Sequence, residues 1–293
     1  MAVGDLITAT RYNSMQSTLE GVLGTGSGNR GYGQTVTSAA VSVGSQVTAT
    51  DMSNLRADLR KTYIHQTGVY PTSDLINSGD TVLDTDASTG KGWTEYEDFI
   101  TSLDSNRLTA DATRMSTTNK ISYTRGSTWN GTVTHTFTAT FANTEDRRFY
   151  FNSGGEIRIA LNIPGGSPTA KDNDWNAMFT AMGTLKFAET SSRTGAGGTF
   201  SQINNTNVTT SPQTIFAANG SGVYSDSDFD ITVAVDAGGT VFTFVIVVRD
   251  DSTEVVDEDV TDMSITTDEF KANSGLGDGL TITSATFSGV TVT

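Results

Sequence analysis

Residues 147–163, RRFYFNSGGEIRIALNI, hold two runs in which apolar side chains recur at every second position. Phe149 and Phe151 flank Tyr150 in the first run, and four aliphatic side chains at 157, 159, 161 and 163 form the second. A period of two is typical of half-buried strands, and the glycine pair at 154–155 favours a sharp turn. The stretch therefore predicts a β-hairpin or a bulged bend, in one sheet with a strand at 133–141.

Further strands are predicted on both sides of this stretch. Residues 133–141 alternate an apolar face with a threonine face, and the alternating run 229–235 returns through a glycine turn into the apolar run 240–249. A short helix is expected around 175–182, and a C-terminal strand tied into a sheet after residue 280. The sequence thus predicts a mainly β protein with an N-terminal helical part, an α+β fold whose body is an antiparallel β-sandwich or jelly-roll-like.

A short internal repeat occurs in the N-terminal third of the sequence. ITAT at 7–10 recurs as VTAT at 47–50, and each copy precedes apolar residues at helical spacing. Thr8 and Thr48 are the expected N-caps. The two helices would form a hairpin docked on the chain's own sheet, or a bundle shared between subunits. In the second case the assembly interface would consist of Tyr12, Met15, Leu19, Met52, Leu55 and Leu59.

Polar, turn-rich sequence between residues 66 and 92 marks the main predicted boundary. The expected organisation is a helical hairpin for anchoring and assembly at 1–68, a linker with an amphipathic helix at 69–128, and an antiparallel β domain at 129–293. The stripe formed by Trp93, Tyr96 and Phe99 on the linker helix is expected to pack onto the sheet.

Composition limits the classes of function. The 293 residues carry a net charge of −15, which disfavours binding to nucleic acid and to anionic membranes. There is no cysteine, and there are two histidines, so thiolate chemistry is excluded and a histidine cluster would need both. No apolar run is long enough for a membrane span, and the first residues lack the basic start of a signal peptide. A soluble protein made in the cytoplasm is expected.

Two loops carry weak binding signals. Asp84 and Glu95 occupy the first and twelfth places of a calcium-loop pattern, but the glycine stands one place late, so a solvated loop is preferred and calcium remains the alternative cofactor. The glycine-rich segment 24–33 lacks the preceding strand, the following helix and the lysine of a phosphate-binding loop. A flexible or close-packed connector is expected there.

No catalytic constellation is recognisable. His135 is in line with the core-facing residues of its strand, which favours a partly buried histidine whose ring nitrogens are satisfied by hydrogen bonds. Asp226, Asp228 and Asp230, with the acidic segment 250–262, could hold cations, but such charge runs are usually solvated. Arg147, Arg148 and Arg158 are expected to form ion pairs across strands or subunits, or simple surface pairs. The sequence therefore predicts a protein that is not an enzyme, with no required cofactor.

Residues 146–158 (DRRFYFNSGGEIR), followed by NDWN at 173–176 and MGT at 182–184, resemble a module of virion structural proteins of tailed bacteriophages, especially of the marine cyanophage type. LITATRYN at 6–13 and the segments GTGSG at 24–28 and YGQ at 32–34 are similar to the N-termini of the same proteins. The resemblance implies a particle component of the tail, neck, baseplate or fibre. It transfers no functional residues.

The predicted function is a non-enzymatic, homo-oligomeric virion component, made in the host cytoplasm and located in the particle. Its expected partners are copies of itself and other virion proteins, with the N-terminal helices anchoring it and the β domain forming the body. The alternative is a receptor-binding module that recognises a host surface glycan through exposed aromatic residues such as Tyr224 or Trp129. A polysaccharide depolymerase is a third class, which requires a carboxylate pair in a cleft.

Overall fold

The computed structural model describes residues 8–71, 83–86, 88, 91–164, 169–252, 260 and 262–293. The chain divides into two compact units. The helical unit comprises Met1–Ser116, Arg148–Gly154 and Lys271–Thr283, and the β unit comprises Thr117–Arg147, Gly155–Phe270 and Ser284–Thr293. The predicted boundary at residue 68 therefore lies inside the helical unit.

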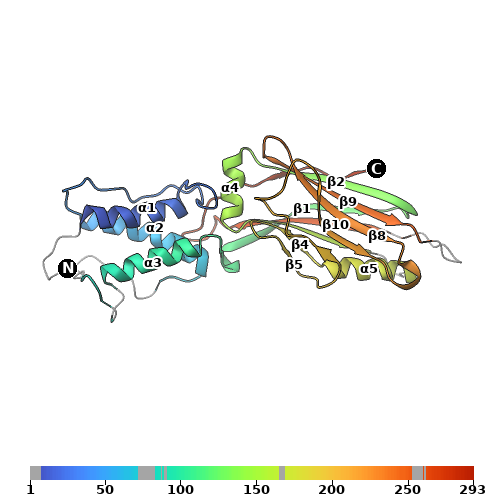
Figure 1. Ribbon diagram of the computed structural model, residues 1–293, viewed down its shortest axis with the longest axis horizontal. Coiled ribbons are helices and arrows are strands. Elements are labelled where there is room, and N and C mark those ends of the chain that lie inside the picture. Colours follow the sequence, from blue (N-terminus) through green and yellow to red (C-terminus); the bar gives the residue numbers. More distant parts are fainter. Residues whose placement is uncertain are drawn as a thin grey trace. The chain divides into compact units, whose positions relative to one another are not determined.

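The helices of the described residues are labelled in Figure 1. They are α1 (Ala9–Leu23), α2 (Ala49–Thr67), α3 (Trp93–Ser105), α4 (Thr144–Asn152) and α5 (Ala170–Met182), with short 3-10 turns at Ala112–Arg114 and Gly222–Tyr224.

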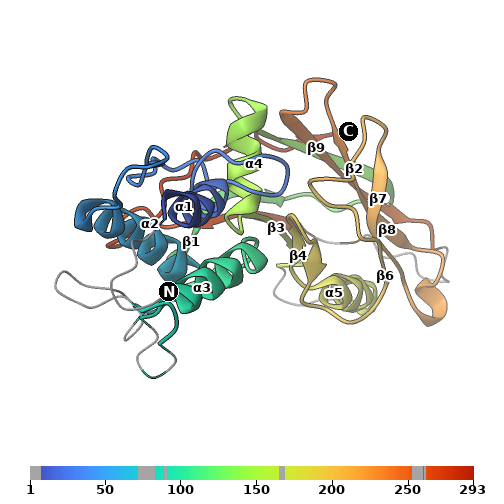
Figure 2. The ribbon, with the colours of Figure 1, turned by 60° about the vertical axis from the view of Figure 1, so that its left-hand side comes forward.

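The predicted third helix is present as α3, but its partner differs from the prediction. Trp93 and Tyr96 are buried in one cluster with side chains of α1 and α2, and Phe99 packs at the edge of this cluster. The expected packing of this stripe onto the sheet is therefore wrong. An amphipathic helix reveals that one face is buried without revealing what covers it, and here two other helices do so (Figure 2).

The β unit is an antiparallel sandwich, which confirms the predicted fold class. Within the described residues, one sheet has five strands in the order β1-β10-β3-β4-β5, and the other has seven in the order β11-β2-β9-β8-β7-β6, with β12 also paired to β2. The strands are β1 (Met115–Arg125), β2 (Gly131–Thr140), β3 (Glu156–Asn162), β4 (Leu185–Phe187), β5 (Ser192–Arg193), β6 (Thr199–Phe200), β7 (Gln213–Asn219), β8 (Asp228–Val235), β9 (Val241–Asp250), β10 (Met263–Ala272), β11 (Thr286–Phe287) and β12 (Thr291–Val292).

Aromatic side chains fill the space between the two sheets. Phe187 of β4 lies edge-to-face against Phe242 and Phe244 of β9, with ring centroids 5.1 and 5.4 Å apart. Phe137 of β2 stacks on Phe244, its directly paired neighbour across the strands, at 5.2 Å. These rings are fully or almost fully buried, and burial of each contributes roughly 1.5–3 kcal/mol. The long alternating strands are thus held by their inner faces.

Helix α5 bridges the two sheets, because it contacts both β3 and β7 (Figure 2). Its Trp175 and Phe179 rings lie 5.8 Å from Trp129 and 5.1 Å from Phe229 respectively. The helix starts at an N-cap threonine, Thr169, which forms a capping box with Asp172. The predicted helix around 175–182 is confirmed and begins earlier than expected.

The first half of the stretch 147–163 forms a helix, so the predicted hairpin is wrong. The Asn143 side chain accepts the Asp146 backbone N–H at 2.8 Å, and Glu145 and Asp146 occupy the first turn of α4, where acidic groups favour the helix dipole. Gly154, at φ 82°, follows the helix. Three alternating aromatics are too few to distinguish a strand from a helix.

The second half of the stretch is β3, as predicted, but it does not join the strand at 133–141. β3 belongs to the five-stranded sheet and β2 to the seven-stranded sheet. The missed strands β1 and β10 complete the former, with β10 paired to β3 over Ser264↔Asn162 to Phe270↔Glu156. The C-terminal strand is confirmed as β11 and β12, both paired with β2.

The two helix starts of the internal repeat provide a matched test of capping. Thr48 accepts the Asp51 backbone N–H in a capping box, whereas Thr8 occupies the N-cap of α1 without a side-chain cap bond. Thr48→Ala should lower the free energy of unfolding of the helical unit by about 1 kcal/mol, and Thr8→Ala by clearly less. Urea denaturation followed by circular dichroism at helical wavelengths measures both. Equal losses would show that the capping box does not stabilise α2.

Candidate functional site

The six predicted assembly residues lie in one cluster inside the helical unit. Exposed fractions range from 0% for Tyr12, Leu19, Leu55 and Leu59 to 8% for Met52. Trp93, Tyr96, Ile100 and Leu103 of α3 complete the cluster. Contacts between subunits through these side chains would require the three helices to separate.

The calcium-like loop is organised by an arginine. Arg11 of α1 donates to both carboxylate oxygens of Glu97 at 2.6 and 2.8 Å and to Asp84 at 2.5 Å. The hydrogen bond from Arg11 holds the pKa of Asp84 below its ordinary value. Glu95 accepts the Asp86 backbone N–H at 3.0 Å. Among the residues that the structure describes, no three acidic or histidine side chains come together as a metal site.

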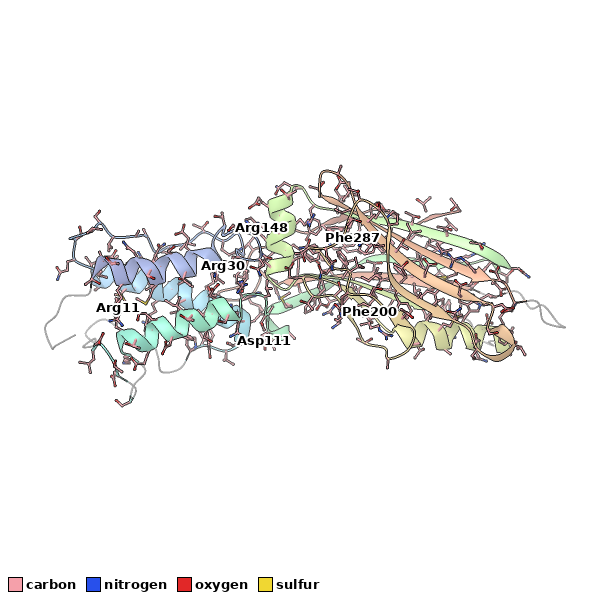
Figure 3. The ribbon with its side chains drawn as sticks, viewed as in Figure 1. Arg11, Arg30, Asp111, Arg148, Phe200 and Phe287 are labelled. Carbon is pink, nitrogen blue, oxygen red and sulfur yellow. The ribbon has the colours of Figure 1, made fainter. Side chains whose placement is uncertain are left out.

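The glycine-rich loop is a close-packed connector, one of the two forms predicted. Arg148 donates to the backbone carbonyls of Thr25, at 2.6 Å, and of Arg30, and Asn152 donates to the Arg30 carbonyl at 3.0 Å. Arg148 and Arg30 are labelled in Figure 3. Gly31, at φ 97°, passes so close to the chain that an added Cβ would lie 2.1 Å from the Thr25 carbonyl oxygen. A phosphate-binding loop presents backbone N–H groups, whereas these contacts use carbonyl oxygens.

Several of the remaining predicted charges form ion pairs within the β unit. Arg249 contacts Asp228 and Asp230 at 2.5 and 2.6 Å across neighbouring strands, and Arg158 contacts Glu156 at 2.6 Å. Arg147 differs from the prediction, because its hydrogen bonds go to neutral groups: the side chain and carbonyl of Asn205 and the carbonyl of Gly239, each at 2.7 Å. Residues 253–259 and 261 of the predicted acidic segment lie outside the described residues.

The two histidines are buried in different ways. Burial lowers the pKa of each to about 4, with Arg125 adding to the effect at His135. His65 Nε2 lies 3.0 Å from the Ser153 carbonyl oxygen. His135 is fully buried, 5.7 Å from the Tyr123 ring, and neither ring nitrogen has a hydrogen-bond partner in the described structure. The predicted state of His135, partly buried and hydrogen-bonded, is therefore wrong. The residues paired with it on the two neighbouring strands are the aliphatic Ile246 and Val292.

The aromatic residues proposed for glycan contact are placed differently from the expectation. Trp129 is 4% exposed and packs against Trp175, so it is not a surface platform. Its position next to β2 carries the ring into the core of the β unit. Tyr224 is partly exposed, and its neighbour Val223 is 72% exposed.

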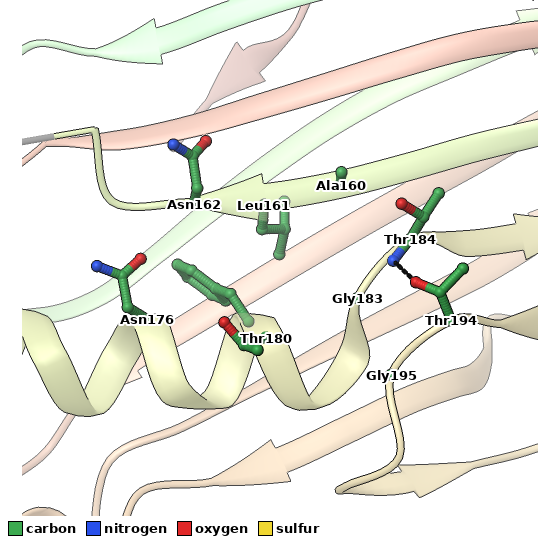
Figure 4. Close-up of a pocket in the computed structure, with 10 residues that line it drawn as sticks. Ala160, Leu161, Asn162, Asn176, Thr180, Gly183, Thr184, Thr194 and Gly195 are labelled. Atoms are coloured by element: carbon green, nitrogen blue, oxygen red, sulfur yellow. Dashed lines mark hydrogen bonds between the residues drawn. The ribbon is translucent and has the colours of Figure 1, made fainter.

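A pocket of about 390 Å³ opens between β3 and α5 (Figure 4). β4 pairs with β3 only as far as Ile159, so the last residues of β3 face the helix across this pocket. Asn176 accepts the Ile163 backbone N–H at 2.9 Å, and Thr194 accepts the Thr184 backbone N–H at 2.8 Å, which fixes part of the lining. The lining consists of Ala160, Leu161, Asn162, Asn176, Phe179, Thr180, Gly183, Thr184, Thr194 and Gly195.

A buried ion pair was missed from the sequence. Lys171 Nζ of α5 lies 3.1 Å from Asp250 Oδ2 of β9, and both side chains are 0% exposed. Two signals could have revealed it. Asp250 continues the buried alternation of β9, and Lys171 precedes Trp175 by one helical turn on the buried face of α5.

Substitution of each histidine by leucine tests whether a hydrogen bond to the buried ring contributes to stability, because His65 has such a bond and His135 has none among the described residues. His135→Leu should raise the free energy of unfolding by about 1–2 kcal/mol at neutral pH, because two buried nitrogens without partners are replaced by an apolar side chain. The matched variant His65→Leu should lower it by about 1–2 kcal/mol, because the buried Ser153 carbonyl loses its donor. Chemical denaturation measures both. Destabilisation by His135→Leu would contradict the described environment.

No helix of the described residues combines the length and the apolarity needed to cross a membrane. Comparison of the chain with protein-family models, with curated proteins and with solved structures finds no match.

Proposed function

We propose that this protein is a non-enzymatic structural component of a tailed-phage virion, which assembles with copies of itself and with other virion proteins. The resemblance of residues 146–158 and of the N-terminal segment to such proteins supports the proposal. The structural observation that supports it most is that polar side chains of the helical unit form hydrogen bonds with the backbone of irregular segments.

Three side chains illustrate these hydrogen bonds. The Asp58 carboxylate, 3% exposed, accepts the backbone N–H groups of Thr37 and Ser38 at 3.0 and 2.7 Å. The Asn13 amide both donates to and accepts from the Val41 backbone, at 2.9 and 2.8 Å. The Gln34 amide makes the same paired contact with Thr281 at 2.9 Å. Buried polar groups that fix loops in this way suit a rigid scaffold.

Assembly in this proposal uses the outer surface of the helical unit. The six cluster residues are occupied within the chain, whereas Val69 and Tyr70, directly after α2, are 56% and 53% exposed. The Arg60 guanidinium lies over the Tyr70 ring at 5.4 Å, which presents the ring beside a cation. Adjacent exposed apolar side chains of this size are suited to burial against a partner.

The test has two parts: whether the protein is present in phage particles, and whether it associates with copies of itself through Val69 and Tyr70. The protein should be found by mass spectrometry in purified particles of a phage that encodes it. The double variant Val69→Ser with Tyr70→Ser should weaken self-association at least about tenfold, because each buried apolar side chain contributes more than about 1.4 kcal/mol. Analytical ultracentrifugation over a range of protein concentrations measures the dissociation constant of self-association.

Val223→Ser, which removes an exposed apolar residue of the β unit, is the matched control and should leave association unchanged. Absence of the protein from the particles would refute the virion role. Unchanged association of the double variant would refute only the proposed surface.

A second candidate function is host-glycan binding, which the pocket between β3 and α5 favours. Its rim offers amide and hydroxyl groups of Asn162, Asn176 and Thr180, and Phe179 lies among the lining residues. Amide and hydroxyl groups can hydrogen-bond to sugar hydroxyls, and the volume is within the range of small-ligand sites, roughly 300–1,000 Å³.

Glycan-array binding with a pocket-blocking variant tests this candidate. Thr180→Trp should reduce binding to any retained glycan at least about tenfold, because the indole would occupy the pocket. Asn173→Trp, at an exposed position of the same helix outside the pocket, is the control. A failure of the wild-type chain to bind any glycan on a broad array would count against the candidate.

A further inference from the structure

The buried pair formed by Lys171 and Asp250 belongs to a small polar group in the β unit. Ser227 donates a hydrogen bond to Asp250 Oδ1 at 3.2 Å, and the hydroxyls of Ser227 and Ser252 are 2.8 Å apart. Ser227 and Ser252 are 0% and 3% exposed. If Ser227 donates to Asp250, the Ser252 hydroxyl donates to Ser227. The carboxylate therefore has an ammonium on one oxygen and a hydroxyl donor on the other.

Burial changes the chemistry open to this pair. Removal from water disfavours both charged forms. Transfer of one proton from the ammonium to the carboxylate would give a neutral amine beside a neutral carboxylic acid. The amine is then a nucleophile, and the acid carries a hydroxyl that can leave as water. Nζ lies 3.1 Å from Oδ2. Because Cγ, the atom that would be attacked, is bonded directly to this oxygen, the amine already lies next to the carbon with which it would react.

We propose that Lys171 and Asp250 form an intramolecular amide bond. The Nζ lone pair attacks Cγ of the protonated Asp250 carboxyl, forming the C–N bond. A proton on nitrogen moves to the Oδ2 hydroxyl, and the C–Oδ2 bond breaks with release of one water molecule. Both groups start as an ion pair and end as a neutral amide and water, so atoms and charge balance without an oxidant or a cofactor.

Ser227 has a defined part in this step. Its hydroxyl donates to Oδ1, the oxygen that becomes negative when the carbonyl carbon is attacked. A fixed donor at that position stabilises the developing charge in a site that excludes water. Ser252 orients the Ser227 hydroxyl through the 2.8 Å contact. Ser227 is therefore a positioning and polarising residue, and the bond itself joins Lys171 to Asp250.

The bond would connect the first turn of α5 to the last residue of β9, 79 positions apart in the sequence. A cross-link that closes a long loop restricts the unfolded chain. It would also hold α5 in place between the two sheets.

Intact mass of the folded, full-length chain tests the proposal. The mass should be lower than the sequence mass by one water molecule. After denaturation and trypsin digestion, the segments 159–186 and 250–271 should appear as one linked species, because the acylated Lys171 resists cleavage. Ser227→Ala should slow formation of the bond at least tenfold in refolded protein followed over time.

Two controls separate the amide from a simple ion pair. Lys171→Arg keeps a cation but cannot form the bond under these conditions, so its mass should equal its sequence mass. Lys120 and Glu269, 2.9 Å apart with Lys120 23% exposed, should yield unlinked peptides because the ammonium remains hydrated. A wild-type mass equal to the sequence mass in protein that is monodisperse and folded by circular dichroism would overturn the proposal.

Discussion

The β unit depends on the burial of aromatic side chains between two antiparallel sheets. Phe242 and Phe244 alternate along β9 and meet Phe187 from the opposite sheet. A shift of one residue would turn the whole inner face of a strand toward solvent, so this packing fixes the register of β9. The same register determines where every second residue goes, including Asp250 at the end of the strand. A charged side chain is thereby carried into the interior by the apolar residues that precede it.

Long alternating runs were the reliable signal in the sequence. β2, β8 and β9 each repeat the pattern over eight residues or more, and their burial follows it. The run at 149–151 was too short, and the features that decide α4, the Asn143 cap and the acidic first turn, lie before it. β1 was missed because most of its side chains are not buried, so it shows little apolar alternation. β10, a central strand, was missed because two of its buried positions hold the polar residues Thr267 and Glu269. A local pattern thus identifies a strand only where the buried side chains are apolar.

Partners of an element were harder to predict than its existence. All three N-terminal helices were expected, yet the stripe of α3 was assigned to the sheet. The apolar residues of α1 and α2 were assigned either to the chain's own sheet or to contacts between subunits. Tyr12 and Leu55 instead share one cluster with Trp93. Hydrophobic burial is non-directional, so the sequence specifies which face must leave water and not which surface receives it. The pocket beside α5 was not predicted either, since it depends on β4 beginning only at Leu185, opposite Ile159.

The buried polar groups of the two units have different partners: backbone groups in the helical unit, and an oppositely charged side chain in the β unit. In the helical unit, Asp58 and Gln34 bind backbone groups, which stabilises loops at little electrostatic cost because the partners are fixed dipoles. In the β unit, Lys171 and Asp250 are charged groups whose desolvation offsets much of their attraction, so an ion pair at this place contributes little net stability. The proposed amide removes that cost, since it replaces two charges by one neutral group. A chain without cysteine cannot use a disulfide for the same purpose. An amide between a lysine and an aspartate would supply a covalent connection that is independent of the redox state of its surroundings, and the dry, hydrogen-bonded site around Ser227 is the environment in which that reaction is favoured.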